Sequence, residues 1–206
     1  MAMKSKVLRF LILIIFLIGT AELFAQSTSL IGKKIQPFTL KNIDHSLISI
    51  NGIKQAKGFM VIFTCNHCPF AKLYSKRLNE LNKKYKKKGV PLLAINSMDS
   101  FLYKEESFEL MQQIAKKEKY NFPYLQDATQ KVGKNFEAQH TPKAYVIWKE
   151  INNWVIEYEG VIDNDGEHPE KAHSYLSEAV EQLLNNKKVS VPKTESFGCR
   201  IFYRKS

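Results

Sequence analysis

The chain has 206 residues, of which 44% are hydrophobic and 25% charged, and its formal net charge is +11. This length suits one compact domain with a sizeable core. The positive charge has no accompanying pattern of basic and aromatic residues, so we expect no nucleic-acid partner. The three cysteines are too few for a disulfide framework, so the core must depend on ordinary burial.

Residues 1–25 have the three-part form of a secretory signal: a basic start, an apolar run over 10–18 and a small-residue exit at Ala25. We expect cleavage near Ala25, which gives an exported protein, periplasmic in a bacterial setting, with a net charge of +9. The apolar run is shorter than the roughly 18 to 20 residues that span a bilayer. An anchor formed by an uncleaved N-terminal segment is the alternative.

The remaining chain alternates between strand and helix patterns. Two extended segments, 37–40 and 47–50, predict an N-terminal β-hairpin. Apolar runs without alternation predict buried strands over 59–64 and 91–96. Further elements are a short strand at 122–125, strands at 143–148 and 154–159 with hairpin spacing, and helices over 69–88, 105–119, 128–136 and 169–186. This order indicates an α/β domain over 26–187, with parallel central strands and a tail over 188–206.

Cys65 and Cys68 lie between the strand at 59–64 and the helix at 69–88. Unpaired backbone N–H groups and the positive end of the helix dipole stabilise a thiolate at such a position. Disulfide exchange needs one reactive thiolate and a second thiol that resolves the mixed disulfide. We therefore interpret the pair as a redox centre in which Cys65 attacks and Cys68 resolves.

Two other residues bear on this centre. His67 lies between the two cysteines, where a charged imidazole would stabilise the thiolate and make the disulfide a stronger oxidant. An exposed histidine with little effect is the alternative. Cys199 in the tail is left without an obvious partner. It is either a spare thiol or a third redox partner that the tail returns to the centre.

With this pair in place, the chain resembles the thioredoxin-like superfamily, in particular its exported redoxin branch of thiol-disulfide oxidoreductases. The resemblance covers about 30–187. It includes the sequence segment 31–40, the predicted strand that leads into Cys65 and Cys68, and the segment from Asp127 to Pro142. It implies a thioredoxin-like α/β fold, with a central mixed sheet flanked by helices and an added N-terminal β-hairpin.

The resemblance also implies roles for individual residues. Pro142 should follow a cis peptide bond and face the disulfide, and Thr141 should offer backbone contacts to substrate. One departure is Phe59, which stands where many thioredoxins have a buried Asp that relays protons. Asp99, Glu105 or solvent could provide another proton route.

The predicted function is exchange of disulfides with protein dithiol or disulfide substrates, with the protein acting as a reductase. Such an exported reductase needs a redox partner, expected to be a membrane-bound electron donor or acceptor, and we expect the protein itself to be a monomer. A disulfide oxidase or isomerase is an alternative. A non-catalytic module of the same fold that binds client proteins is another.

Other redox classes fit less well. A thiol peroxidase shares the architecture, but its reactive cysteine follows a threonine by three residues, and Ile62 stands there. Haem attachment requires a histidine directly after the second cysteine, and here Pro69 occupies that position after Cys68. Zinc needs about four ligands, and the cysteine pair with His67 or His140 is an incomplete set. We therefore expect neither a cofactor nor a metal.

Overall fold

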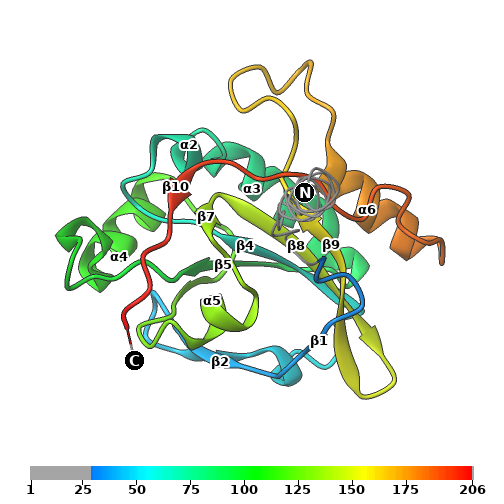
Figure 1. The fold of residues 1–206 in the computed structure, drawn as a ribbon, viewed down its shortest axis with the longest axis horizontal. Coiled ribbons are helices and arrows are strands. Elements are labelled where there is room, and N and C mark those ends of the chain that lie inside the picture. The colour runs from blue at the N-terminus through cyan, green and yellow to red at the C-terminus, as the bar shows by residue number, and fades with distance from the viewer. Residues whose placement is uncertain (1–28, 206) are drawn as a thin grey trace, which may run out of the picture.

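The computed structural model describes residues 29–205. The predicted signal segment and its cleavage position lie outside the described residues. Within 29–205 the chain builds one eight-stranded sheet with helices on both faces (Figure 1). A helix with the length and apolar character to cross a membrane does not occur in this range.

The sheet is mixed, and its strand order is β1-β9-β8-β4-β5-β6-β2-β3. Its strands are β1 (Lys34–Ile35), β2 (Thr39–Asn42), β3 (Leu47–Ser49), β4 (Gly58–Phe63), β5 (Leu92–Asn96), β6 (Tyr124–Gln126), β8 (Lys143–Glu150) and β9 (Asn153–Gly160). Strands β4, β5 and β6 are parallel, whereas β8 and β9 form an antiparallel hairpin beside β4. The hairpin of β2 and β3 extends the other edge. These pairings confirm the thioredoxin-like fold class with its added N-terminal hairpin.

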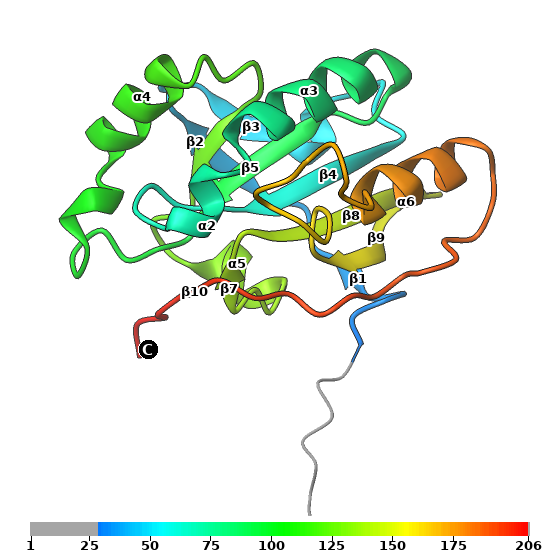
Figure 2. The same ribbon diagram turned by 90° about the horizontal axis from the view of Figure 1, so that it is seen from above.

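The helices are α2 (Pro69–Lys72), α3 (Ser75–Tyr85), α4 (Phe108–Lys117), α5 (Lys131–Asn135) and α6 (Tyr175–Leu184), with short 3₁₀ turns η1 (Ile50–Gly52), η2 (Lys86–Lys88) and η3 (Lys104–Glu106). Figure 2 shows α3, α4 and α6 on one face of the sheet, and α5 with the C-terminal segment on the other. This layering leaves β4 covered on both sides.

Strand β4 shows how the sequence produces these layers. All six of its residues are buried. Phe59, Val61 and Phe63 join the core on the α5 side, while Met60 and Ile62 join the core beneath α3, α4 and α6. Successive side chains of a strand point to opposite faces, so a wholly apolar strand has to lie between two cores.

All four predicted helices differ from the observed ones in their bounds. The helix predicted over 128–136 spans Lys131–Asn135, and the one predicted over 169–186 spans Tyr175–Leu184. The helix predicted over 69–88 is interrupted, because the N–H of Tyr74 bonds to the Ala71 carbonyl at 3.1 Å, a tight i to i−3 turn that ends α2. The helix predicted from 105 begins instead at Phe108, since the Ser107 hydroxyl caps it by accepting from the N–H of Leu110 at 3.3 Å.

The C-terminal segment also departs from the expected pattern. It contains β10 (Cys199–Arg200), which pairs antiparallel with β7 (His140–Thr141) in a separate small sheet. The segment runs along the face of the molecule that carries α5 (Figure 2). It therefore crosses the end of the domain where β4 meets α2 (Figure 1).

Candidate active site

The redox pair predicted from the sequence lies at the junction of strand and helix. Cys65 follows β4, and Cys68 is the N-cap residue of α2, directly before Pro69. Both side chains are buried, with exposed fractions of 6% for Cys65 and 0% for Cys68. Both are free thiols. The predicted position at a helix start is confirmed.

Thr141 contacts both sulfurs. Its hydroxyl lies 3.1 Å from Cys65 Sγ, and its carbonyl oxygen accepts from Cys68 Sγ at 3.2 Å. The bond between Thr141 and Pro142 is cis, as the resemblance implies. The segment around Pro142 therefore forms one wall of the dithiol site.

The two thiols influence one another's ionisation. A hydrogen bond from the Cys65 thiol lowers the pKa of Cys68 to about 4. The same hydrogen bond, together with burial and the nearby charge of Glu106, raises the pKa of Cys65. One thiolate shared across a hydrogen bond is the expected form of such a pair. The two thiols thus share one proton and one negative charge.

Glu106, in η3, supplies a buried negative charge next to the pair. Its carboxylate accepts the backbone N–H groups of Asn66, at 2.9 Å, and His67, at 2.9 Å. The side-chain amide of Asn96, at the end of β5, donates to it at 2.6 Å. Every one of these bonds is accepted by Glu106, as expected for an ionised carboxylate. Glu106 thus holds the turn between the cysteines in place.

His67 is bound to the same carboxylate. Its Nδ1 lies 2.5 Å from Glu106 Oε1, and its ring stacks on Tyr103 with 5.4 Å between ring centroids. The positive charge of a protonated imidazole would therefore be offset by Glu106 rather than directed only at the sulfurs. This pairing reduces the predicted stabilisation of the thiolate by His67, and with it the predicted oxidising strength of the disulfide.

The candidate proton routes lie elsewhere. Glu105 is exposed, and Asp99 pairs with Arg204 at 3.5 Å. The acid close to the pair is Glu106, which the sequence analysis did not single out. The sequence gives little indication that Glu106 belongs to the site, because this residue lies far from the cysteines along the chain, in a turn without a motif. Asn66 was missed too; its side chain is buried and accepts from the Tyr124 hydroxyl at 2.9 Å.

Cys65, His67 and Glu106 place a sulfur, a ring nitrogen and a carboxylate oxygen within 4.8 Å of one another. These are atoms that could ligate a metal. The Glu106 oxygens, however, already accept from Asn66, His67 and Asn96. Ligation would break this buried network at a cost of about 1 to 3 kcal/mol for each group left unpaired. The donor set therefore fits a hydrogen-bonded turn better than a metal centre.

The third thiol lies at the same place. Cys199 of β10 is opposite Thr141 in the register of the small sheet, and it packs against the core cluster that contains Cys65 and Cys68. Its thiol contacts the Cys68 sulfur. Burial, followed by this contact and the charge of Cys68, raises the pKa of Cys199 to about 12. The tail does return Cys199 to the pair.

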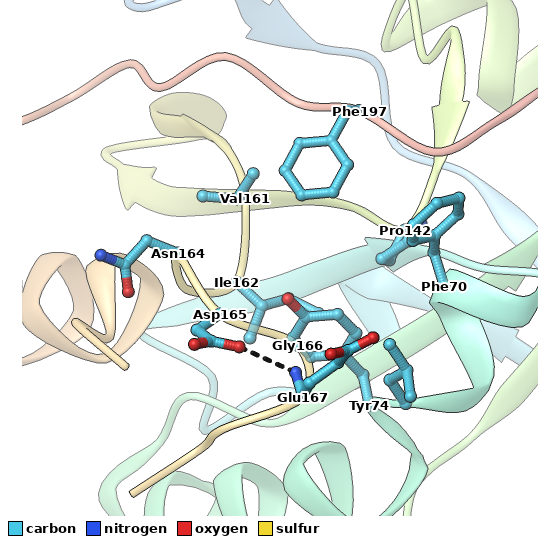
Figure 3. Close-up of a pocket in the computed structure, with 11 residues that line it drawn as sticks. Phe70, Tyr74, Pro142, Val161, Ile162, Asn164, Asp165, Gly166, Glu167 and Phe197 are labelled. Carbon is cyan, nitrogen blue, oxygen red and sulfur yellow. Dashed lines mark hydrogen bonds between the residues drawn. The ribbon is translucent and has the colours of Figure 1, made fainter. Parts of the chain in front are cut away.

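A pocket with mostly apolar walls opens at Pro142, the residue after Thr141 (Figure 3). It has a volume of about 220 Å³, and its walls include Phe70, Leu73, Pro142, Val161 and Phe197. The aromatic rings of Phe70 and Phe197 meet edge to face with 5.9 Å between centroids. The C-terminal segment, which carries Phe197, therefore completes the pocket.

Comparison with known proteins agrees with this fold. The model of the AhpC/TSA family matches residues 31–164. An uncharacterized conserved protein from Geobacillus kaustophilus is 32% identical, with a TM-score of 0.78, over 87% of this chain and 95% of that one. A hypothetical protein from Sinorhizobium meliloti is 28% identical, with a TM-score of 0.78, over 87% and 98%. No curated protein matches the chain.

A thiol-disulfide oxidoreductase from Bacteroides fragilis is 19% identical, with a TM-score of 0.52, over 63% of this chain and 90% of that one. At this identity the likeness concerns the fold alone. In this chain Cys65 and Cys68 lie between the end of the central strand β4 and the start of α2.

Proposed function

The chain belongs to the AhpC/TSA family of thioredoxin-like proteins, and on this basis we propose that it is an exported thiol-disulfide oxidoreductase that reduces protein disulfides. One observation carries the proposal. The free thiols of Cys65 and Cys68 lie together at a helix start, and both sulfurs form a hydrogen bond with Thr141 beside cis Pro142. Two adjacent thiols, one of them ionised, are what exchange with a disulfide requires.

The reaction follows from the shared hydrogen bond. As the Cys65 thiolate attacks a substrate disulfide, the proton that the pair shares stays on Cys68. A bond forms between Cys65 and one substrate sulfur, while the other leaves as a thiolate. That thiolate takes up the proton from Cys68. Cys68 then attacks Cys65, closing the internal disulfide and releasing the second substrate thiolate. The substrate gains two electrons, and the cysteine pair loses two.

Glu106 has two effects that favour the reducing direction, whereas the lowered pKa of Cys68 stabilises the reduced form and acts in the opposite direction. The buried charge of Glu106 disfavours a thiolate on Cys65, and the Glu106 contact offsets the charge that His67 would otherwise bring to the sulfurs. A less stable thiolate makes the reduced form less stable and the pair a better electron donor. An oxidase or isomerase would instead need a stabilised reduced form.

The surroundings of the pair favour a protein substrate. Phe70 and Leu73, in and directly after α2, are 44% and 43% exposed, and Phe197 is 59% exposed. Apolar side chains exposed together around a pocket commonly mark a binding surface. A polypeptide with an apolar side chain near its disulfide would fit this surface.

Export is supported by the form of residues 1–25. The electron donor would then lie outside the cytoplasm, and we propose a membrane-bound dithiol partner. Expression of the whole chain in a bacterial host, followed by N-terminal sequencing of the periplasmic fraction, tests this step. We expect the mature protein to begin at Gln26; retention of the uncut chain in the membrane fraction would show an anchor instead.

The function itself is tested by equilibrating the protein with glutathione buffers and measuring the fraction of Cys65–Cys68 disulfide. We expect a reduction potential above about −300 mV, because purely structural disulfides lie below that value. Insulin reduction with a regenerating dithiol should show turnover. A couple that cannot be reduced by glutathione would indicate a bracing disulfide, and rapid peroxide consumption without insulin reduction would indicate a peroxidase.

A further inference from the structure

The C-terminal segment brings a third sulfur to the residue that holds the other two. Cys199 pairs with Thr141 across β10 and β7. The Thr141 hydroxyl and carbonyl oxygen lie 3.1 and 3.2 Å from the sulfurs of Cys65 and Cys68. All three thiols therefore gather around one short strand.

Backbone hydrogen bonds fix this segment on both sides of Cys199. The N–H of Thr194 donates to the carbonyl of Glu159 at 3.0 Å, and the N–H of Ile201 donates to the carbonyl of Gln139 at 2.8 Å. Ile201 is 3% exposed. A thiol held between two such anchors keeps a defined distance from its neighbours.

Gly198 allows the close approach. Its backbone has φ +143, and a Cβ atom at this position would lie 2.1 Å from the Thr141 carbonyl oxygen. Any other residue would push the segment away from Thr141. The glycine directly before Cys199 thus determines how near the third thiol lies to the pair.

Cys68 is the sulfur that the other two share. It interacts with both the Cys65 thiol and the Cys199 thiol, and it donates at 3.2 Å to the carbonyl of Thr141, the residue opposite Cys199. Exposure increases outward, since Cys68 and Cys65 are buried at 0% and 6%, whereas Cys199 is only partly buried. An incoming partner can reach Cys199 before it reaches the pair.

We propose that Cys199 is a third redox-active thiol, which takes over the disulfide from Cys65 by bonding to Cys68. This inference rests on the proposed exchange at Cys65 and Cys68, and it adds a residue to that reaction. The three sulfurs share a single disulfide, whose position alternates between Cys65–Cys68 and Cys68–Cys199.

The exchange is balanced and needs no further oxidant. Starting from the Cys65–Cys68 disulfide, the Cys199 thiolate attacks Cys68 Sγ. The Cys68–Cys199 bond forms as the Cys65–Cys68 bond breaks. Cys65 leaves as a thiolate and takes the proton given up by Cys199. Cys68 carries no negative charge in the disulfide, so this part of the barrier to ionising Cys199 is then absent.

The outer disulfide can then be reduced from outside. A protein dithiol attacks Cys199 Sγ, the Cys68–Cys199 bond breaks with Cys68 as the leaving thiolate, and the second thiol of the donor resolves the mixed disulfide. The donor is oxidised by two electrons, and the protein returns to three thiols. Cys199 is thereby the contact point for the electron donor.

The test uses the mature chain oxidised with diamide, followed by blocking of free thiols and peptide mapping by mass spectrometry. In the Cys65→Ser variant we expect most molecules to contain a Cys68–Cys199 disulfide. In the Cys68→Ser variant we expect Cys65 and Cys199 both to stay free of an internal bond. Circular dichroism checks the fold of each variant, and Cys65→Ala replaces Cys65→Ser if the latter does not fold.

The outcomes separate this inference from the proposed function. If wild type forms the Cys65–Cys68 disulfide but oxidised Cys65→Ser contains only free Cys68 and Cys199, the third thiol is refuted and the proposed function stands. If oxidised wild type forms neither disulfide, both proposals fail. A Cys65–Cys199 bond in Cys68→Ser would refute Cys68 as the shared sulfur.

A second variant tests the geometry. Adding Gly198→Ala to Cys65→Ser should lower the yield of the Cys68–Cys199 disulfide by about tenfold, because the new Cβ displaces Cys199 from Thr141. Gly52→Ala is the matched control, since the nearest atom to its Cβ would lie at 3.7 Å. Equal yields in the two glycine variants would overturn the role assigned to the close approach.

Discussion

At the scale of single residues, we assign the two sulfurs of the site different roles: Cys65 attacks the substrate, and Cys68 resolves the mixed disulfide. The hydrogen bond between Cys65 and Cys68 gives them opposite pKa shifts, and Thr141 contacts both. Substitutions that remove one sulfur at a time should therefore have different consequences.

Cys65→Ser should abolish insulin reduction, because the residue that attacks the substrate disulfide is missing and the buried Cys68 cannot take its place. Cys68→Ser should accumulate a mixed disulfide with insulin, since the resolving thiol is missing. Non-reducing electrophoresis with mass spectrometry checks both results. A Cys68→Ser variant that never captures insulin would contradict the assignment of Cys65 as the attacking residue.

The pKa of Cys68 leads to a prediction on pH. The ultraviolet absorbance of the thiolate in the reduced protein should persist at neutral pH and disappear as the pH falls through about 4. Cys65→Ala removes the main hydrogen-bond donor, so the midpoint should move up towards the ordinary value of about 8.5. A wild-type midpoint already near that value would show that the shared hydrogen bond does not stabilise the thiolate.

Glu106 has a testable effect on the reduction potential. Glu106→Gln removes the negative charge beside Cys65, so the reduced form gains stability and the potential should rise by roughly 30 mV, equivalent to about tenfold in the equilibrium constant. Glu105→Gln is the matched control, because Glu105 is the exposed neighbour in the same turn. Equal potentials for both variants would exclude an electrostatic role for Glu106.

At the scale of elements, the break between α2 and α3 shapes the pocket. The Tyr74 hydroxyl donates to the buried Asp163 at 3.0 Å, which ties the break to the loop after β9. Phe70 and Leu73 remain exposed on the other side and line the pocket with Phe197 (Figure 3). A continuous helix, as the sequence predicts, would not give this arrangement.

The pocket predicts a separation between substrates. Leu73→Asp should raise the KM for insulin by about tenfold, since it replaces an apolar contact by a charge, and should leave exchange with glutathione unchanged. Lys76→Gln, at an exposed position three residues along the chain, is the control, because it changes the net charge by the same −1. An equal loss for insulin and glutathione would mean that Leu73 acts on the sulfurs and not on substrate binding.

At the scale of the whole molecule, two cores hold the sheet, and the one on the α5 side lies beneath the site. Phe136 is fully buried there and packs against Phe63 and Tyr145, with 5.4 and 5.1 Å between ring centroids. Tyr145 also donates to the Phe136 carbonyl at 2.8 Å. The strand that leads to Cys65, β4, thus packs on this aromatic cluster through Phe63.

Phe136→Ala should lower the free energy of unfolding by about 3 to 5 kcal/mol, because it leaves a cavity in a close-packed core. Phe101→Ala, at a position 82% exposed, should cost less than about 1 kcal/mol. Urea unfolding followed by fluorescence measures both. Similar losses would show that this core is not closely packed around Phe136.

Much of the fold and the inner site could be predicted from local patterns. The apolar run of β4, the spacing of Cys65 and Cys68, and the hairpin of β8 and β9 are properties of short segments, so the sequence alone was sufficient for them. The cis bond before Pro142 followed from the resemblance and is confirmed. The boundaries of the signal, domain and tail stay predictions, as do export and the redox partner.

The sequence by itself determined which two thiols lie together at a helix start, because a helix start and two thiols three residues apart are local features. Only the tertiary structure decided what surrounds them. Glu106 reaches the turn from η3, and β10 places Cys199 opposite Thr141. Such contacts join segments far apart in the chain, and no short-range pattern encodes which distant residue completes a hydrogen bond or covers a sulfur.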